Sequence, residues 1–193
     1  MVSILVHASL AAVRPAPTGA MNAEDDRTDA ALAAAGDAEA FGRLYWRHAV
    51  RVKALARRLL GPADADDGAQ EVFVRAWSRL GQFRGEAAFG TWLHRLAVNV
   101  LVRQLHRQRR HAGEGDAALE HVAGPEPRRP DADLERALRS LPEGIRGVVV
   151  LHDMEGYTHD EIAELLGIGV SASKMRLHRG RTALRPLVGG MRE

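Results

Sequence analysis

Apolar residues recur at steps of three and four along most of this chain, which predicts amphipathic α-helices rather than strands. The first such helix begins after Asp37, a good N-cap residue, and ends at Gly61-Pro62. Because His48 lies on the apolar face, we expect a core or boundary histidine rather than a ligand. That face comprises Phe41, Leu44, Tyr45, His48, Val52, Leu55 and Leu59.

A second helix follows the acidic turn at 63–67, and its start is rich in acidic and amide side chains. Such residues fit the positive end of a helix dipole, and they fit equally well a polar patch that contacts a protein partner. Composition does not choose between these interpretations. The acidic and amide residues are Asp66, Asp67, Gln70 and Glu71, and the apolar face carries Val72, Phe73, Ala76, Trp77 and Leu80.

A glycine-bracketed loop at 82–86 carries Phe83 and Arg84 and leads into a helix predicted from about 87 to 110. No acid occurs between 87 and 113. Basic residues interleaved with aromatic ones are typical of single-stranded nucleic-acid binding, because bases stack on rings while positive charge follows the backbone. We expect core packing for Phe89, and the pattern leaves the role of Trp92 open. The core side holds Phe89, Leu93, Leu96, Ala97, Val100 and Leu101, and the polar side holds His94, Arg95, Asn99, Arg103, His106, Arg107, Arg109 and Arg110.

Periodicity stops between 111 and 130, a stretch rich in Gly, Pro and acids that predicts an interdomain linker. Helical periodicity then resumes, and Pro142 favours the first turn of a further helix, which we expect to end at Glu155-Gly156. The apolar positions of these two helices are Leu134, Ala137, Leu138 and Leu141, followed by Ile145, Val148, Val149 and His152.

The stretch from 155 to 185 predicts a helix-turn-helix. Thr158 and Glu161 have the spacing of a capping box, and Gly167 stands where a left-handed residue ends a helix most easily. The chain then turns basic, with six Lys or Arg and no acid from 166 to 192. A basic helix face is often only a solvated surface, but this charge boundary favours a DNA major groove. We expect Val170, Ser173, Leu177 and Leu184 to be buried, and Ser171, Ala172, Lys174, Met175, Arg176, His178 and Arg179 to face outward.

These patterns predict an all-α protein of two small helical domains joined by a flexible linker, with the helix-turn-helix in the C-terminal one. We expect a flexible N-terminal extension at 1–36, a first domain at 37–110, the linker at 111–130 and a second domain at 131–193. We hypothesise that translation starts at Met21 rather than at Met1. No apolar run reaches the roughly 20 residues that span a bilayer, and the N-terminus lacks the basic flank of a signal peptide. We therefore expect a cytoplasmic protein.

The 193 residues carry a formal net charge of only +2, yet the charges are segregated, so we expect a polyanionic partner at selected faces. The absence of Cys excludes disulfides, thiol catalysis and cysteine-ligated zinc. The nine histidines form no HExxH motif, and neither His106/His111 nor His152/His159 has i, i+4 spacing. With no phosphate-binding glycine loop and no nucleophile motif, we expect no enzyme, no metal and no cofactor.

Four ordered segments resemble the two conserved domains of bacterial RNA polymerase sigma factors of the extracytoplasmic-function (ECF) group. They are DADDGAQEVFVRAW, FRGEAAFGTWLHRLAVN, LPEGIRGVVVLHDMEGYTHDEIAELLG and SKMRLHRGRTALR, over about 37–110 and 131–187. The resemblance implies a protein without catalysis of its own that binds core RNA polymerase, directs it to two-element promoters and melts the -10 element. It also implies an anti-sigma factor as a further partner.

The resemblance assigns roles by matching position. It implies polymerase contacts for Asp66, Asp67, Gln70, Glu71 and Phe73. It places Phe83, Arg84, Trp92, Asn99 and Arg103 at the melted -10 element. On the duplex -35 element it places Lys174, Arg176 and Arg179 at phosphates or base edges, with Ser171 and Ala172 nearest the bases and with Met175 and His178 on the same face.

Three positions depart from the family pattern. The family commonly has a β-branched apolar residue where Ser173 stands and Thr or a similar residue at Ala172. A hydroxyl that faces the core tends to bond back to a carbonyl four residues earlier, so we expect a less firmly docked recognition helix. Gly68 stands inside a helix where the family has a larger apolar residue, at a cost of about 1 kcal/mol against Ala on an exposed surface.

Two other classes of protein fit parts of the pattern. A stand-alone helix-turn-helix regulator with an N-terminal sensing or dimerisation domain would bind duplex DNA without polymerase. A protein-binding helical adaptor would keep its function after charge reversal at Arg176 and Arg179.

Overall fold

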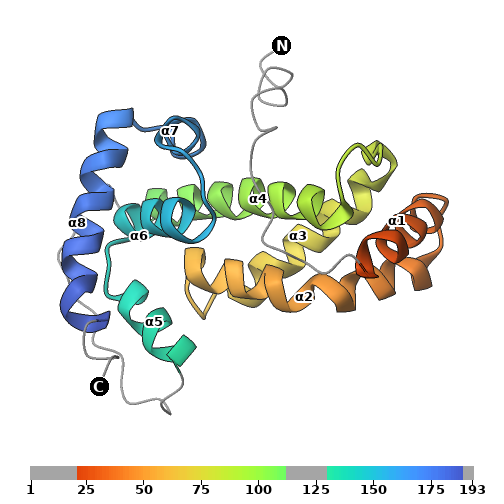
Figure 1. Ribbon diagram of the computed structural model, residues 1–193, viewed down its shortest axis with the longest axis horizontal. Coiled ribbons are helices and arrows are strands. Elements are labelled where there is room, and N and C mark those ends of the chain that lie inside the picture. Colours follow the sequence, from red (N-terminus) through yellow and green to blue (C-terminus); the bar gives the residue numbers. More distant parts are fainter. Residues whose placement is uncertain (1–20, 112–129, 189–193) are drawn as a thin grey trace. The chain divides into compact units, whose positions relative to one another are not determined.

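The computed structural model describes residues 21–111 and 130–188, which separate into two compact units (Figure 1). The described residues of the first unit are 21–111, and those of the second are 130–188. Both units are built from helices, and no strand occurs in these two ranges. The predicted all-α fold with two small helical domains is therefore confirmed, whereas the predicted linker lies outside the described residues.

The first unit contains α1 (Met21–Ala34), α2 (Ala38–Leu60), α3 (Ala65–Arg79), the 3₁₀ turn η3 (Leu80–Gln82) and α4 (Phe89–His111). Asp37 caps α2 as predicted, because its side chain accepts hydrogen bonds from the amides of Glu39 and Ala40. Helix α4 contacts α1, α2 and α3 and is buried over a broad face. The core includes Leu44, Leu59, Val72, Phe89, Leu93, Val98, Leu101 and Leu105.

The prediction of a flexible extension is wrong for Met21–Ala34, which form α1 and pack on the N-terminal half of α2 (Figure 1). Its weak amphipathic pattern hides the helix, because the buried positions include two carboxylates, Asp26 and Asp29. These carboxylates are neutralised by basic residues of α2, so their burial is compatible with a stable helix. Residues 1–20 lie outside the described ranges.

Gly68 is not an exposed weak point in α3. It is buried, and a Cβ atom there would lie 2.6 Å from Leu60 Cδ1 and 3.0 Å from Leu101 Cδ2. The glycine is therefore what allows α3 to approach α2 and α4 closely. The cost expected from helix propensity alone is the wrong measure at this position.

The second unit contains α5 (Pro130–Arg139), α6 (Glu143–Val149), the π-helical turn η4 (Val150–Met154), α7 (His159–Leu166) and α8 (Val170–Val188). Pro142 stands at the N-cap of α6, one residue before the position predicted for it. Helix α8 packs on α5, α6 and α7. The core includes Leu138, Leu141, Val148, Leu151, Tyr157, Ile162, Leu166 and Leu177. Each helix of the described ranges is too short or too polar to cross a lipid bilayer.

Candidate functional site

The helix-turn-helix has the local signals that its sequence predicts. The Thr158 amide donates to Glu161 Oε2 at 2.8 Å, and the Glu161 amide donates to Thr158 Oγ1 at 3.3 Å, which completes the capping box. Gly167 ends α7 with φ of 62° and ψ of 37°, the left-handed conformation that glycine adopts without strain. Three residues later α8 begins, so the two helices are joined by a tight turn.

Helix α8 divides into a buried side and a solvent side. Ser173 and Leu177 are buried against the unit, and Val170 and Leu184 are half-buried. Among the predicted DNA contacts, Ala172 and Arg176 are half-buried. The exposed members of the set are Ser171, Lys174, Met175, His178 and Arg179, which cover two successive turns of one face. A straight basic stripe of this length can follow one groove of a duplex.

Ser173 does not behave as expected from its departure from the family pattern. It is completely buried, and its Oγ lies 2.9 Å from His159 Nδ1 at the start of α7. The hydroxyl therefore bonds across the turn to the other helix instead of back to its own helix backbone. This hydrogen bond satisfies the buried hydroxyl and joins the two helices of the motif. The bond back to a carbonyl of the same helix, on which the prediction of weaker docking was based, is replaced by this contact.

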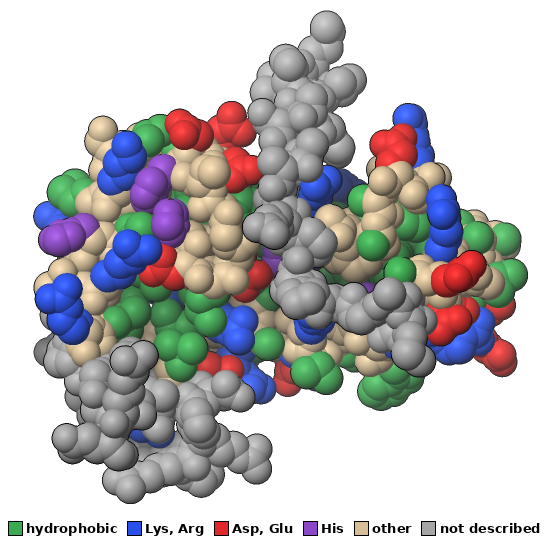
Figure 2. Space-filling model, in the orientation of Figure 1, with side chains coloured by type: hydrophobic (Ala, Val, Ile, Leu, Met, Phe, Trp, Pro, Cys, Tyr) green, Lys and Arg blue, Asp and Glu red, His purple; other side chains and the backbone are tan. Residues whose placement is uncertain are grey.

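Charged groups surround the hydrogen bond between Ser173 and His159. The His152 and His159 rings lie 4.7 Å apart, and Asp153 accepts hydrogen bonds from His152 Nδ1 at 2.9 Å and from Arg181 Nε at 3.0 Å. Burial, with the nearby His152 and Lys174, lowers the pKa of His159, which favours the neutral imidazole. The Arg181 hydrogen bond lowers the pKa of Asp153. Figure 2 shows basic and histidine side chains gathered over α7 and α8.

Three aromatic rings form a cluster, here called the aromatic cluster, where the loop at 83–88 meets α4. Phe83 lies 5.7 Å from Phe89 and 5.5 Å from Trp92, measured between ring centroids, and Phe89 lies 5.5 Å from Trp92. Phe89 is buried, as expected, whereas Phe83 and Trp92 are half-buried. One part of the Trp92 ring therefore packs in the cluster and the rest is accessible, so its stacking role stays a prediction.

The polar side of α4 continues from this cluster. Arg84 and Arg103 are exposed, and Asn99 is half-buried with its amide donating to the Arg95 carbonyl at 2.9 Å. Burial chiefly, and then the positive charges of Arg51 and Arg95, lower the pKa of His94 on this basic side of α4. An accessible ring edge beside such a face is an arrangement that can hold unpaired bases and their phosphates.

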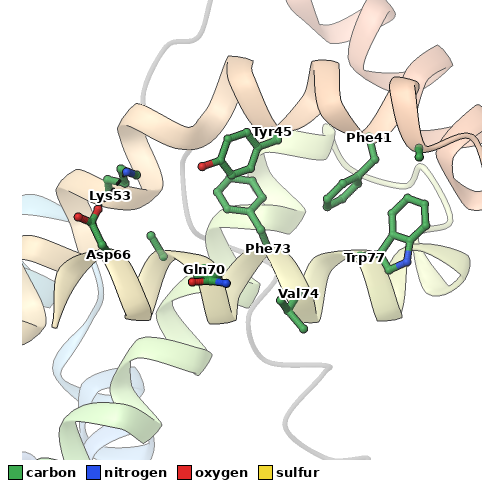
Figure 3. A pocket seen from close by; sticks show the side chains of 10 residues that line it. Phe41, Tyr45, Lys53, Asp66, Gln70, Phe73, Val74 and Trp77 are labelled. Atoms are coloured by element: carbon green, nitrogen blue, oxygen red, sulfur yellow. Dashed lines mark ion pairs between the residues drawn. The ribbon is translucent and has the colours of Figure 1, made fainter.

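A groove of about 550 Å³ runs between α2 and α3 (Figure 3). Phe73 lies in its floor and is only 6% exposed, with its ring 4.6 Å from Tyr45 and 6.5 Å from Phe41. At one end of the groove, Lys53 Nζ lies 2.9 Å from Asp66 Oδ1, and this hydrogen bond lowers the pKa of Asp66. The lining residues are Ala38, Phe41, Tyr45, Lys53, Asp66, Ala69, Gln70, Phe73, Val74 and Trp77.

The groove brings together three of the five residues predicted to bind polymerase, Asp66, Gln70 and Phe73. Asp67 is exposed outside it, and Glu71 is half-buried and paired with Arg75 at 2.8 Å. The sequence analysis missed the contribution of α2 and grouped Trp77 with the apolar face of α3, although Trp77 and Val74 are exposed. The sequence did contain a signal for this groove: α2 and α3 carry more large apolar side chains, such as Tyr45, Val74 and Trp77, than their buried faces require.

Comparison with known proteins identifies the family of both units. Residues 44–111 match the sigma-70 region 2 family, and residues 131–184 match the sigma-70 region 4 family. The chain is 32% identical over 165 residues to the ECF RNA polymerase sigma-E factor of Escherichia coli strain K12, covering 77% of this chain and 86% of that protein. It is 35% identical over 181 residues to the ECF RNA polymerase sigma factor SigM of Mycobacterium tuberculosis, covering 90% and 91%.

The chain belongs to the ECF sigma factors. A solved structure of CnrH in complex with the cytosolic domain of CnrY is similar to this sigma factor with a TM-score of 0.51 and 35% identity, covering 86% of this chain and 98% of that one. The predicted function is confirmed: this sigma factor directs RNA polymerase to promoters, and the stand-alone regulator is not favoured. Within the described residues, no group of three or more His, Asp or Glu side chains is arranged to hold a metal ion.

Proposed function

We propose that three surfaces of this sigma factor divide promoter recognition among them. The groove between α2 and α3 binds core polymerase, the aromatic cluster with the basic side of α4 holds the melted -10 strand, and the exposed side of α8 reads the duplex -35 element. The observation that carries this proposal is the pairing of accessible aromatic rings with positive charge in one unit and a basic helix without Phe, Tyr or Trp in the other. We assign the first two tasks to α1–α4 and the third to 131–193.

The -10 assignment rests on the two half-buried rings. Phe83 and Trp92 are each held by ring contacts on one side, so their accessible parts are presented in a defined orientation. A base that leaves the duplex can stack on such a ring, at roughly 1–3 kcal/mol per base. Arg84, Asn99 and Arg103 then supply charge and hydrogen bonds to the strand.

The -35 assignment rests on the exposed side of α8. Ser171 and Ala172 lie in its first turn, where the helix N-terminus comes nearest to the base edges of a major groove. Lys174, Arg176 and Arg179 suit phosphates or guanine, and Met175, half exposed, suits a thymine methyl group. A hydroxyl and small apolar side chains at the first turn favour contact with methyl groups over bidentate readout.

The polymerase assignment rests on the groove. Its floor is aromatic, its rim carries Asp66 and Gln70, and α3 adds the exposed side chains of Asp67 and Val74. An amphipathic helix of the polymerase with basic residues beside its apolar stripe fits this combination. In this role the sigma factor performs no covalent chemistry of its own and works in the cytoplasm with the polymerase.

A regulatory partner is also part of this proposal. CnrH was solved with the cytosolic domain of a second protein, CnrY. We propose that an anti-sigma factor binds this chain in a comparable complex and keeps the groove from the polymerase. Competition between the two for the groove predicts that substitutions at Tyr45 or Trp77 weaken both complexes.

Transcription with purified core polymerase tests the function. Addition of this protein should produce initiation at specific sites on a genomic promoter library, with sequence preference in two blocks. Phe83→Ala should slow strand opening on duplex promoters, while a promoter that is already mismatched at its -10 element should be transcribed almost normally. Loss of initiation by Phe83→Ala on both templates to the same degree would contradict the -10 assignment.

A further inference from the structure

Two buried carboxylates of α1 pair with different basic residues of α2. Asp29 is 6% exposed and pairs with Arg43 at 2.6 Å and with Arg47. Asp26 is 4% exposed and pairs with Arg47 at 2.8 Å and with His48 at 2.8 Å. Both carboxylates therefore dock α1 on α2, but only Asp26 reaches the histidine.

His48 connects this docking site to the aromatic cluster. Its Nε2 donates to Asp26 Oδ2, and its ring lies 5.3 Å from the Phe89 ring at an angle of 60°. A Cβ atom on Gly90 would lie 3.2 Å from His48 Cε1, so the imidazole is pressed against the first turn of α4. Phe89 in turn supports Phe83 and Trp92. A fixed His48 ring therefore limits how the whole cluster can shift.

A second contact reaches the loop itself. Arg27, the neighbour of Asp26 in α1, donates from Nη2 to the Gly85 carbonyl at 3.4 Å. Gly85 has φ of 71°, a conformation that other residues rarely adopt. Because α1 also contacts η3, α1 holds the loop that carries Phe83 directly. His48 acts on the same ring indirectly, through Phe89, against which Phe83 packs.

We infer that α1 is a positioning element for promoter melting: Asp26 orients His48, which supports the aromatic cluster, and Arg27 holds the loop of Phe83. This inference rests on the proposed role of the cluster at the -10 element. Stacking on a ring gains most when the ring is already in place, because no side-chain ordering then opposes capture of the base. Asp26, Arg27 and His48 touch no DNA in this mechanism and act through the rings.

Asp26→Asn and Asp29→Asn form a matched pair for the test. Each replaces one buried carboxylate of α1 that faces Arg47, and only the first alters the contact with His48. Holoenzyme reconstituted with each variant is mixed with a promoter carrying 2-aminopurine in the -10 element, and the rate of opening is measured. The same measurement on a promoter mismatched at the -10 element removes the melting step.

Asp26→Asn should open the duplex promoter roughly five- to tenfold more slowly than Asp29→Asn, and the difference should vanish on the mismatched promoter. Arg27→Ala, an exposed change that leaves the buried pairs intact, should slow opening about twofold. Equal rates for the two asparagine variants, or no effect of Arg27→Ala, would overturn the inference. If Asp26→Asn does not fold, Arg27→Ala decides alone.

Phe83→Ala separates this inference from the function on which it rests. If Phe83→Ala slows opening but Asp26→Asn matches Asp29→Asn, the cluster melts DNA and α1 does not position it. If Phe83→Ala opens the duplex at the normal rate, the -10 role of the cluster is wrong, and the role of α1 falls with it.

Discussion

The two proposed DNA surfaces differ in how many elements build them. The side of α8 that faces solvent belongs to a single helix, so its residues are aligned as soon as that helix forms. The aromatic cluster combines the loop at 83–88 with the first turn of α4, and it rests on His48 of α2, which α1 holds in place. A one-helix surface needs only to be docked, whereas a surface of several elements needs each of them at the correct position.

A histidine supports each of the two proposed DNA surfaces: His48 lies beneath the aromatic cluster, and His159 bonds to the buried side of α8. The two histidines have different environments. His48 is buried and bonded to a carboxylate, and His159 is half-buried and bonded to the Ser173 hydroxyl. The hydrogen bond between His48 and Asp26 belongs to a network that includes Arg43 and Arg47. The hydrogen bond between His159 and Ser173 joins only α7 and α8. We therefore expect the cluster to be sensitive to charge changes far from DNA, and α8 to be sensitive mainly to its own exposed charges.

The largest expected effect is on that exposed face. Lys174→Glu combined with Arg179→Glu should weaken promoter-directed initiation roughly 30- to 100-fold and reduce the salt dependence of binding by about two charges. Both side chains are exposed on the proposed DNA side. The control is Arg185→Glu, which changes an exposed charge further along α8. It should change initiation less than threefold in the same transcription assay, because a charge distant from the DNA is screened by salt.

The next largest expected effect is the loss of stability when a closely packed glycine is replaced by alanine. A Cβ atom on Gly180 would meet Val149 Cγ2 and Ile145 Cγ2, the latter at 2.9 Å. Because β-branched side chains are stiff, Gly180→Ala should cost about 2–3 kcal/mol in chemical denaturation. Gly68→Ala, which meets the softer ends of two leucines, should cost about 1–2 kcal/mol.

Gly42 is the matched control for these two substitutions, since it also lies inside a helix and a Cβ atom there would meet nothing within 4 Å. Gly42→Ala should stabilise the protein by about 0.5–1 kcal/mol, because alanine favours the helix. Equal effects of all three substitutions would contradict the packing argument.

The hydrogen bond between Ser173 and His159 should contribute less to the free energy of unfolding than the close packing at these glycines. Ser173→Ala leaves His159 Nδ1 without this bond, and we expect a loss of about 1 kcal/mol in the free energy of unfolding. Ser171→Ala, on the exposed side, should leave stability unchanged. A Ser173→Ala protein as stable as the parent would show that the hydrogen bond is not what docks the helix.

The smallest expected effect is on pH dependence. The pKa of His159 lies below its ordinary value of 6.5 because of burial, then His152 and Lys174, with Arg181 adding to this and Asp160 opposing it. The unfolded chain therefore binds the proton first as pH falls, and stability conferred by neutral His159 is lost from about pH 6.5 downward. His159→Gln should flatten this part of the curve of unfolding free energy against pH. A curve of unchanged slope would assign the dependence to other groups.

Much of this protein is determined by its sequence alone, because the signals involved are local. Helical spacing, the Asp37 cap, the Thr158–Glu161 capping box and the left-handed Gly167 each act within about one turn of the chain. The two sides of α8 follow from the same periodicity, which predicted five of its seven outward residues correctly, whereas Ala172 and Arg176 are half-buried at the border of the packed side.

Tertiary structure alone decided the features that join distant residues. Asp26 meets His48 across 22 positions, His159 meets Ser173 across 14, and Arg27 meets Gly85 across 58. From the sequence, the carboxylates of α1 resemble an exposed polar surface, because their basic partners lie on another helix. Gly68 likewise resembles a weak helix residue, because the sequence does not show that Leu60 and Leu101 pack against it. Such contacts depend on which helix faces lie together, and a one-dimensional pattern does not contain that pairing.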